Sequence, residues 1–276
     1  MLRKLFFLIM LSTGAGILLL SVMVWDGLRA HPDSFAGLPR PAQFSWLRLT
    51  HVIDKPGFVL GYSEARANPL WVAYRLEFRP HGPIGARPEH FRIDRRTLRR
   101  VTPADYRGSG FDRGHLAPNY AMARFFGREA QLASFAMSNI VPQRPALNQK
   151  LWQRLEEIEA DVYSGSSAAL WVVTGPLFDE RREWLDGSVE VPDAFFRIWL
   201  RRGAGGQPEA LAFIVPQAVS GYEPLDRFVV SVDAVEAASG LDFFHRLDEA
   251  SEAALEAAVN PPAWNLAAHA RRPPRY

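Results

Sequence analysis

One short segment near the middle of the chain limits the possible folds more than any other. Residues 110–119 read GFDRGHLAPN and bring a carboxylate, a guanidinium and the imidazole of His115 together beside two glycines. The preceding residues, 104–109, are rich in turn formers, so no helix continues into this segment. Glycines let the backbone bend sharply and let a large charged ligand come close. A histidine placed there titrates near neutral pH and suits a general base.

A second segment contributes further polar residues that could act together with those of residues 110–119. Residues 138–149 read SNIVPQRPALNQ, and a proline-marked helix start then leads on through Glu156. The run Asp112, Arg113, Gly114, His115, followed by Asn139 to Asn148 and by Glu156, resembles the DNA/RNA non-specific endonucleases, which are the ββα-metal nucleases. The similarity extends through WVVTGPLF at 171–178 to residues 225–241 and covers roughly residues 55–245.

This resemblance implies both a fold and an activity. The fold is α+β, with a central and mainly antiparallel sheet flanked by helices. The activity is a metal-dependent, largely sequence-non-specific endonuclease that hydrolyses DNA and RNA and leaves 5′-phosphates. Mg²⁺ is the expected metal and Mn²⁺ is plausible. The family often forms homodimers, so the resemblance also allows one here.

The candidate site residues have distinct expected roles. His115 activates water, and nearby arginines disfavour its imidazolium form and keep it neutral. Arg113 and Arg87 are candidates to hold the scissile phosphate. The resemblance assigns the metal to Asn148, while Asn139 and Glu156 match other site positions of the family. Asp112 is expected to orient Arg113 or the loop backbone rather than bind metal, and the sequence leaves that choice open.

The distribution of charge along the chain also favours a nucleic-acid substrate. The net charge is only +2, but residues 79–128 hold eleven arginines, no lysine and four acidic residues. Arginine forks suit bidentate phosphate contacts, so this excess predicts a surface that follows a phosphate backbone. A solvated basic face is the simpler alternative. Cysteine is absent, which excludes disulfides, thiolate catalysis and cysteine-ligated metal sites.

A competing function is a non-catalytic, membrane-tethered nucleic-acid-binding protein. It would keep the arginines but has no need of His115, Asn148 and Glu156 together. The chain also lacks the Gly-x-Ser-x-Gly, phosphate-loop, His-Glu-x-x-His and Gly-x-Gly-x-x-Gly motifs of other enzyme classes. The nuclease is therefore favoured.

The N-terminal segment predicts a membrane helix. Residues 5–25 carry no charge and follow Arg3 and Lys4, and a span of this length crosses a bilayer. A retained anchor is favoured over a cleaved signal peptide because the apolar run is long and no small-x-small cleavage site follows. Either case places the enzyme outside the cytoplasm, anchored on the periplasmic or extracellular side or secreted.

The spacing of apolar residues and the composition of each segment predict the domains and the secondary structure of the chain. We expect an anchor or signal segment at 1–26, a proline-rich tether at 27–55, one α+β nuclease domain at 56–260 and a disordered tail at 261–276. Strands are expected at 58–62, 70–78, 169–173, 195–200, 211–215 and 228–232. Helices are expected at 120–137, at 147–162, at 233–240 with Asp233 as its cap, and at 251–259.

Overall fold

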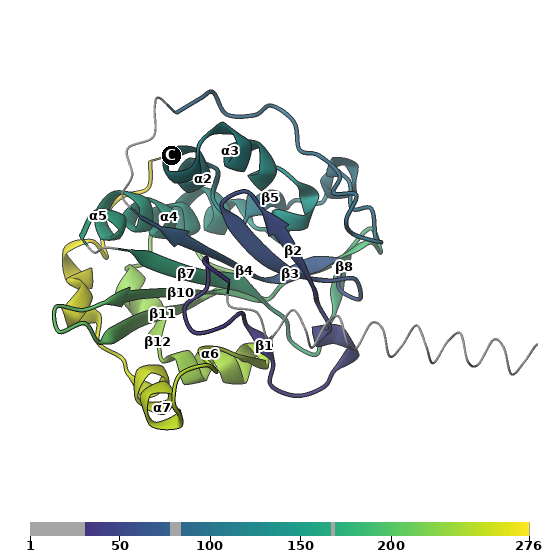
Figure 1. Ribbon diagram of the computed structural model, residues 1–276. Helices are drawn as coiled ribbons and strands as arrows, with labels where there is room; N and C mark the ends of the chain where they lie inside the picture. Colours follow the sequence, from purple (N-terminus) through teal and green to yellow (C-terminus); the bar gives the residue numbers. More distant parts are fainter. Residues whose placement is uncertain (1–30, 78–83, 167–168, 276) are drawn as a thin grey trace, which may run out of the picture.

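The computed structural model describes residues 31–77, 84–166 and 169–275, and it is organised around one antiparallel sheet (Figure 1). The strand order is β12-β11-β10-β7-β4-β3-β2, and every neighbouring pair is antiparallel. The strands are β2 (His51–Lys55), β3 (Phe58–Ser63), β4 (Asn68–Leu76), β7 (Leu170–Leu177), β10 (Ala194–Arg202), β11 (Pro208–Pro216) and β12 (Val229–Val230).

Helices and smaller strand pairs surround this sheet. The pairs are β1 (Arg40–Pro41) with β13 (Leu241–Asp242), β5 (Asp112–His115) with β6 (Ile140–Gln143), and β8 (Glu183–Leu185) with β9 (Val189–Val191). The helices are α2 (Asn119–Phe126), α3 (Arg128–Ser134), α4 (Gln153–Ile158), α5 (Ser164–Ser166), α6 (Val232–Ser239) and α7 (Glu249–Ala257). Two π-helical turns, η4 (Leu147–Trp152) and η5 (Glu159–Tyr163), flank α4. Short 3-10 turns are η1 (Trp46–Arg48), η2 (Pro103–Tyr106), η3 (Met137–Asn139), η6 (Leu225–Phe228), η7 (Pro261–Trp264) and η8 (Leu266–Ala268).

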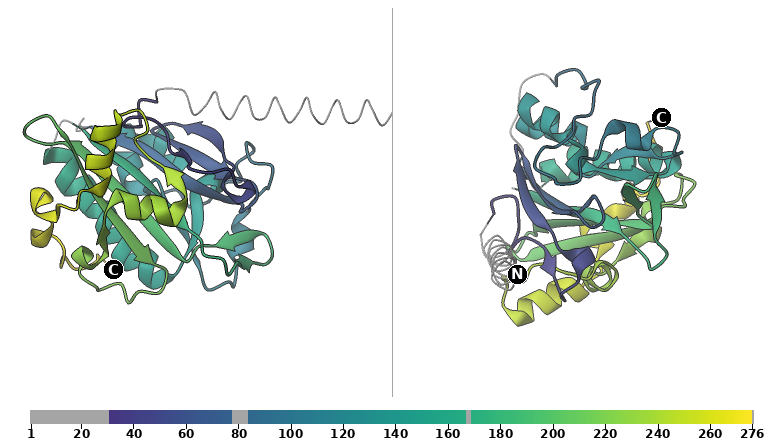
Figure 2. Two further views of the ribbon diagram at one scale, coloured as in Figure 1. Left: turned by 90° about the horizontal axis from the view of Figure 1, so that it is seen from below. Right: turned by 90° about the vertical axis from the view of Figure 1, so that its right-hand side faces the viewer.

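The sheet has helices on both faces because its strands are apolar on both faces. Along β10, Phe195 and Trp199 belong to the core under α2 and α4, whereas Phe196 and Ile198 belong to the core under α6 and α7. Side chains alternate between the two faces of a strand, so one sequence serves both cores. Figure 2 shows α2 and α3 on one side of the sheet and α6 and α7 on the other. The predicted α+β class, with a mainly antiparallel sheet flanked by helices, is confirmed.

Two of the expected unstructured regions are ordered in the structure, and those predictions are wrong. Within the predicted tether, β2 is the edge strand of the main sheet, and β1 pairs with residues 241–242 from the far end of the chain. Within the predicted disordered tail, Trp264 and Leu266 are buried in the core. β1 was missed because its partner strand lies near the other end of the chain, and the order of the tail was missed because Trp264 packs against Tyr163 and Trp199 from earlier elements.

Helix boundaries also differ from the prediction. The expected helix 120–137 is interrupted at Gly127, whose φ of +83° is a left-handed value that suits glycine and ends α2 before α3 begins. Helix α6 is capped by Ser231, whose side chain accepts from Ala234 N at 3.1 Å, and Asp233 lies in the first turn instead. The predicted helix 147–162 is present, with π-helical turns at both ends.

The predicted membrane helix at 5–25 lies outside the described residues. Among residues 31–77, 84–166 and 169–275, no helix has the length and hydropathy needed to cross a membrane. The location outside the cytoplasm and the homodimer stay predictions.

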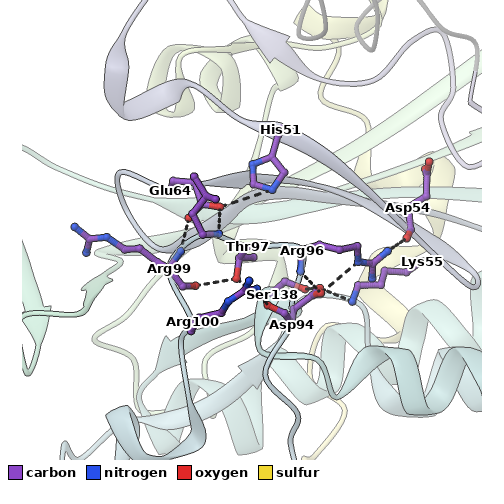
Figure 3. A network of polar contacts seen from close by, with 11 residues as sticks. His51, Asp54, Lys55, Glu64, Asp94, Arg96, Thr97, Arg99, Arg100 and Ser138 are labelled. Carbon is purple, nitrogen blue, oxygen red and sulfur yellow. Dashed lines mark hydrogen bonds and ion pairs between the residues drawn. The ribbon is translucent and has the colours of Figure 1, made fainter. Parts of the chain in front are cut away.

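A buried ion pair fixes the arginine-rich connection between β4 and β5 (Figure 3). Lys55 Nζ lies 2.6 Å from Asp94 Oδ2, and the two side chains are 5% and 6% exposed. Asp94 also accepts from Ser138 Oγ at 2.6 Å and from Arg96 N at 3.1 Å. Burial alone would raise the pKa of Asp94, but the hydrogen bonds from Lys55 and Ser138 hold this pKa well below its usual range. This network therefore holds the connection against β2 and against the residue before Asn139.

Replacing Asp94 by asparagine is expected to lower the free energy of unfolding by about 3 kcal/mol at pH 7, because Lys55 then stays buried without its counter-charge. A depressed pKa contributes stability above the unfolded pKa of 3.8 and loses it as pH falls through the folded value. The deficit of the variant should therefore shrink below about pH 4. Urea unfolding of the wild type and of Asp94→Asn at pH 7 and at low pH measures this difference in the free energy of unfolding. Asp54→Asn, whose side chain is 73% exposed, is the control and should change stability by less than about 0.5 kcal/mol.

Candidate active site

His115 is positioned by the short β5–β6 ladder, in which it pairs with Ile140. The buried Gln143 side chain lies over Gly114, where an added Cβ would come within 2.0 Å of Oε1 and 2.7 Å of Cγ, so any larger residue beside the histidine would displace Gln143. The His115 side chain is 8% exposed and packs edge-on against Phe135, with ring centroids 4.8 Å apart. Backbone pairing and packing therefore fix where the imidazole lies.

Asn139 does not line the cleft, contrary to its predicted place among the reacting groups. Its side chain is fully buried, and its Oδ1 accepts from Ala117 N at 2.9 Å. Its Nδ2 donates to Ala117 O at 3.0 Å and to Ser134 O at 2.9 Å. The Asn139 carbonyl also accepts from Leu116 N at 3.1 Å. Asn139 thus clamps the backbone that follows His115 and acts as a positioning residue.

Two aromatic rings hold the expected phosphate-binding arginines near His115. The Arg113 guanidinium lies over Phe91 at 4.8 Å, and the Arg87 guanidinium lies over Phe135 at 5.2 Å. The same two rings contact the imidazole, with centroids 5.4 and 4.8 Å from it. Cation–π attraction orients each guanidinium without occupying its hydrogen-bond donors. The structure therefore brings His115, Arg113 and Arg87 together, as predicted.

His115 is neutral in this setting. Burial, and then the positive charge of Arg87, lower the pKa of His115 to about 3. Nε2 is buried and has no hydrogen-bond partner among the described residues. An uncharged imidazole beside two cations can accept a proton, and an arriving phosphate stabilises the imidazolium that results.

A cleft of about 460 Å³ opens over these groups. It contains five of the six predicted site residues and several that the sequence did not single out. The lining residues are Arg87, Arg113, His115, Asn119, Tyr120, Asn148, Gln149, Gln153, Glu156, Glu157 and Arg275. Guanidinium groups, an imidazole, and amide and carboxylate oxygens thus share one open space, which is the arrangement expected of an active site.

A hydrogen bond to Asp112 fixes the orientation of the Asn148 side-chain amide. The Asn148 side-chain amide donates to Asp112 Oδ2 at 2.9 Å, and Gln149 Nε2 donates to the same oxygen at 2.8 Å. Asp112 was expected to orient Arg113 or the loop backbone; the structure shows that it orients the amides of η4 instead. Because the Asn148 nitrogen is turned to Asp112, its carbonyl oxygen Oδ1 is left to accept or to coordinate.

Glu156 lies in the cleft above a buried charge network. Its Oε1 is 3.9 Å from Arg197 NH2, and Arg197 is completely buried on β10. Arg197 also donates to Leu116 O at 3.3 Å and lies 3.6 Å from Glu159 Oε2. Burial raises the pKa of Glu156 to about 8; Arg197 opposes the rise and Glu159 adds to it. Arg197 thus links Glu156 to the backbone that follows His115.

Sequence reasoning missed Arg197, although a signal was available. It stands between Phe196 and Ile198 at a position that faces the core under α2 and α4. A charged residue at such a position of a buried strand requires a partner, and partnered buried charges often belong to sites. Arg275 carried no signal, because only the folded chain brings the C-terminus to the cleft.

Another group of acidic residues lies away from the cleft. Asp233, Glu236 and Glu256 place carboxylate oxygens within 4.8 Å of one another, between α6 and α7. These helices cover the opposite face of the sheet from α2 and α3 (Figure 2). This cluster is therefore separate from the cleft that holds His115.

Comparisons with known proteins agree with this site. The sequence profile described as DNA/RNA non-specific endonuclease matches residues 46–250. The chain is 37% identical over 218 residues to mitochondrial endonuclease G of Homo sapiens, with 73% of this chain and 72% of that protein covered. It is 32% identical over 270 residues to the mitochondrial nuclease EXOG of Homo sapiens, covering 87% and 71%. A nuclease of Nostoc is 29% identical, covering 76% and 79%.

A solved structure shows the same fold. A chain of the EndoG/EndoGI complex, whose crystal structure was described for the mechanism of EndoG inhibition, matches with a TM-score of 0.64 and 25% identity. The match covers 75% of this chain and 90% of that one. Since the family profile spans most of the sequence, the chain belongs to the DNA/RNA non-specific endonuclease family, as a hydrolase of the nuclease class.

Proposed function

We propose that this protein is a metal-dependent endonuclease that hydrolyses phosphodiester bonds in DNA and RNA with little regard to sequence. The observation that carries the proposal is the neutral, buried imidazole of His115 in an open cleft that the guanidinium groups of Arg87 and Arg113 also line. A base that shares a cleft with two cations able to bind phosphate suits the attack of water on phosphorus.

The cleft residues fit a hard divalent cation such as Mg²⁺, with Mn²⁺ as a substitute. The Asn148 nitrogen is bound to Asp112, so a neutral oxygen donor remains for the ion. Glu156 lines the same cleft and can hold a water of the ion's hydration shell. Mg²⁺ keeps several waters and is often bound through few protein oxygens together with substrate phosphates. When bound, the ion supplies stabilisation of the negative charge that develops on the phosphate and on the leaving oxygen.

The chain's own residues account for the remaining steps. Arg87 and Arg113 bind and orient the phosphate. His115 accepts a proton from water, the water oxygen forms a bond to phosphorus, and the bond from phosphorus to the 3′ oxygen breaks. The leaving oxygen takes up a proton and becomes a 3′-hydroxyl, and the other product carries the 5′-phosphate. Asn139 and Arg197 hold the backbone after His115 in place throughout.

Low sequence specificity is supported by what the charged groups of the cleft can contact. Guanidinium groups bind phosphates, which are present in every sequence of both DNA and RNA. We therefore expect the full-length chain with Mg²⁺ to cut both plasmid DNA and an RNA transcript.

Analysis of the product ends tests the chemistry. Fragments should be ligatable without prior phosphorylation, since they carry 5′-phosphates and 3′-hydroxyls. Fragments with only 3′-phosphate ends would contradict the proposed direction of cleavage. Binding without any cleavage would favour the alternative of a non-catalytic nucleic-acid-binding protein.

A further inference from the structure

The C-terminal segment is packed into the fold as far as Ala270. Trp264 is 1% exposed, and the Ala270 carbonyl accepts from Leu225 N at 3.0 Å and from Arg154 NH2 at 2.6 Å. Arg154 is itself buried on α4. Residues 271–275, here called the C-terminal arm, therefore leave the core from a fixed point. Figure 1 shows the C-terminus beside the helices α2 and α4.

The arm ends on the wall of the active-site cleft. Arg275 Nε lies 3.0 Å from Glu157 Oε1, and Arg275 NH2 lies 3.3 Å from Asp161 Oδ2. The Arg275 backbone N–H donates to Gln153 Oε1 at 3.3 Å, and Arg272 NH2 is 3.5 Å from Glu157 Oε1. Four contacts thus hold the arm along α4 and η5.

These contacts change the charge of the wall. Glu157 lines the cleft with its side chain only 6% exposed, and its second oxygen already accepts from Gln153 Nε2 at 3.0 Å. Without the arm, Glu157 would present an uncompensated carboxylate to an incoming phosphate chain. With the arm, Arg272 and Arg275 offset this charge, so the wall favours a polyanion rather than repelling it.

Arg275 also keeps donors for a ligand. Its side chain is 45% exposed and lines the same cleft as Arg87 and Arg113. Its contacts with Glu157 and Asp161 use Nε and one terminal nitrogen, and a guanidinium has a second terminal nitrogen with further N–H groups. A phosphate group is the ligand that best matches donors in this planar arrangement.

We infer that Arg275, at the end of the C-terminal arm, is a phosphate-binding residue of the cleft that contacts the nucleic-acid backbone and, with Arg272, neutralises Glu157. This inference rests on the proposed function and names an additional binding position for it. The family match ends at residue 250, so the arm lies beyond the region that the family profile covers.

Steady-state cleavage by full-length variants at several salt concentrations tests the inference. Arg275→Gln should raise KM about fivefold at 50 mM salt with kcat nearly unchanged, because one unit charge close to phosphate is lost. kcat/KM falls as salt rises from 50 to 200 mM, because salt weakens phosphate contacts. If Arg275→Gln loses one such contact, its fold-decrease in kcat/KM over this range should be about three to four times smaller than that of the wild type. Arg275→Lys keeps the charge but loses the planar donors, so its KM should lie between those of the wild type and Arg275→Gln.

Arg271→Gln is the matched control, since Arg271 belongs to the same arm, is exposed and does not line the cleft. It should leave KM, the salt dependence and Tm unchanged. A wild-type KM and salt dependence in Arg275→Gln would overturn the inference, and so would faster cleavage, which would mean that the arm blocks the cleft. Wild-type protein that cleaves nothing would instead refute the proposed function, so the two failures are distinguishable.

Discussion

Replacing His115 by alanine is expected to lower kcat by about 10²- to 10⁴-fold, the usual effect of losing a general base. KM should change little, because the guanidinium groups of Arg87 and Arg113, which are proposed to bind phosphate, lie over Phe135 and Phe91 and are not held by the imidazole. Single-turnover cleavage together with binding to a labelled strand measures the two effects separately.

Two further variants make the His115 result specific. His115→Gln keeps more of the buried volume against Phe135 and should be as inactive as His115→Ala, which separates loss of the base from loss of packing. His90→Ala removes a histidine from the same part of the chain whose side chain is 88% exposed, and it should retain wild-type turnover. A His115→Ala enzyme with near-normal kcat would mean that another group is the base.

The second large effect concerns the proposed metal-binding residues. Asn148→Ala should be nearly inactive at every Mg²⁺ concentration, because it removes the oxygen donor that Asp112 orients toward the cleft. Glu156→Gln should lose about ten- to a hundredfold in activity, the usual effect of removing a group that acts through metal-bound water, and extra Mg²⁺ should partly restore it. Rate measured against Mg²⁺ concentration for both variants tests this order.

Controls for this experiment come from the same helix. Gln149→Ala removes the second amide that donates to Asp112 Oδ2 and should lose far less activity than Asn148→Ala, if loss of a ligand is the cause. Glu156→Gln should fold normally, because glutamine matches glutamate in size and keeps one oxygen to face Arg197, whose NH2 lies 3.9 Å from Glu156 Oε1. If Glu156→Gln were less active than Asn148→Ala, the two roles would be reversed.

Local patterns in the sequence predicted most of the sheet and the centre of the site. Strands such as β4 and β10 are runs of apolar and β-branched residues that are recognisable without a partner. The stripe from Leu147 to Ile158 predicted the helix that carries Asn148 and Glu156. His115 and Arg113 were singled out because their side chains suit a general base and a phosphate ligand, whereas Asn148 was singled out through the resemblance to the family.

What the sequence did not show depends on contacts between distant residues. β1 exists only because residues 241–242 pair with it, and the arm reaches the cleft only because Ala270 is tied to Arg154. Asn139 was placed in the site because it matches a site position of the family, and the sequence does not show whether such an amide binds a ligand or holds the backbone. Its hydrogen bonds to Ala117 distinguish the two roles.

The π-helical turn η4 was also beyond prediction. A π-helical turn is a single-turn feature inside a longer helix, and such turns often occur at functional sites. Here η4 contains both amides that bind Asp112, Asn148 and Gln149. Apolar periodicity indicates the helix but does not show where its winding changes.

The central claim is that phosphodiester hydrolysis in this cleft requires a divalent metal ion. It is tested most directly by incubating the full-length protein with plasmid DNA in EDTA and then adding Mg²⁺ in excess of the chelator. The account predicts no cleavage in EDTA and full recovery on addition of Mg²⁺. Cleavage that continues undiminished in EDTA would contradict it.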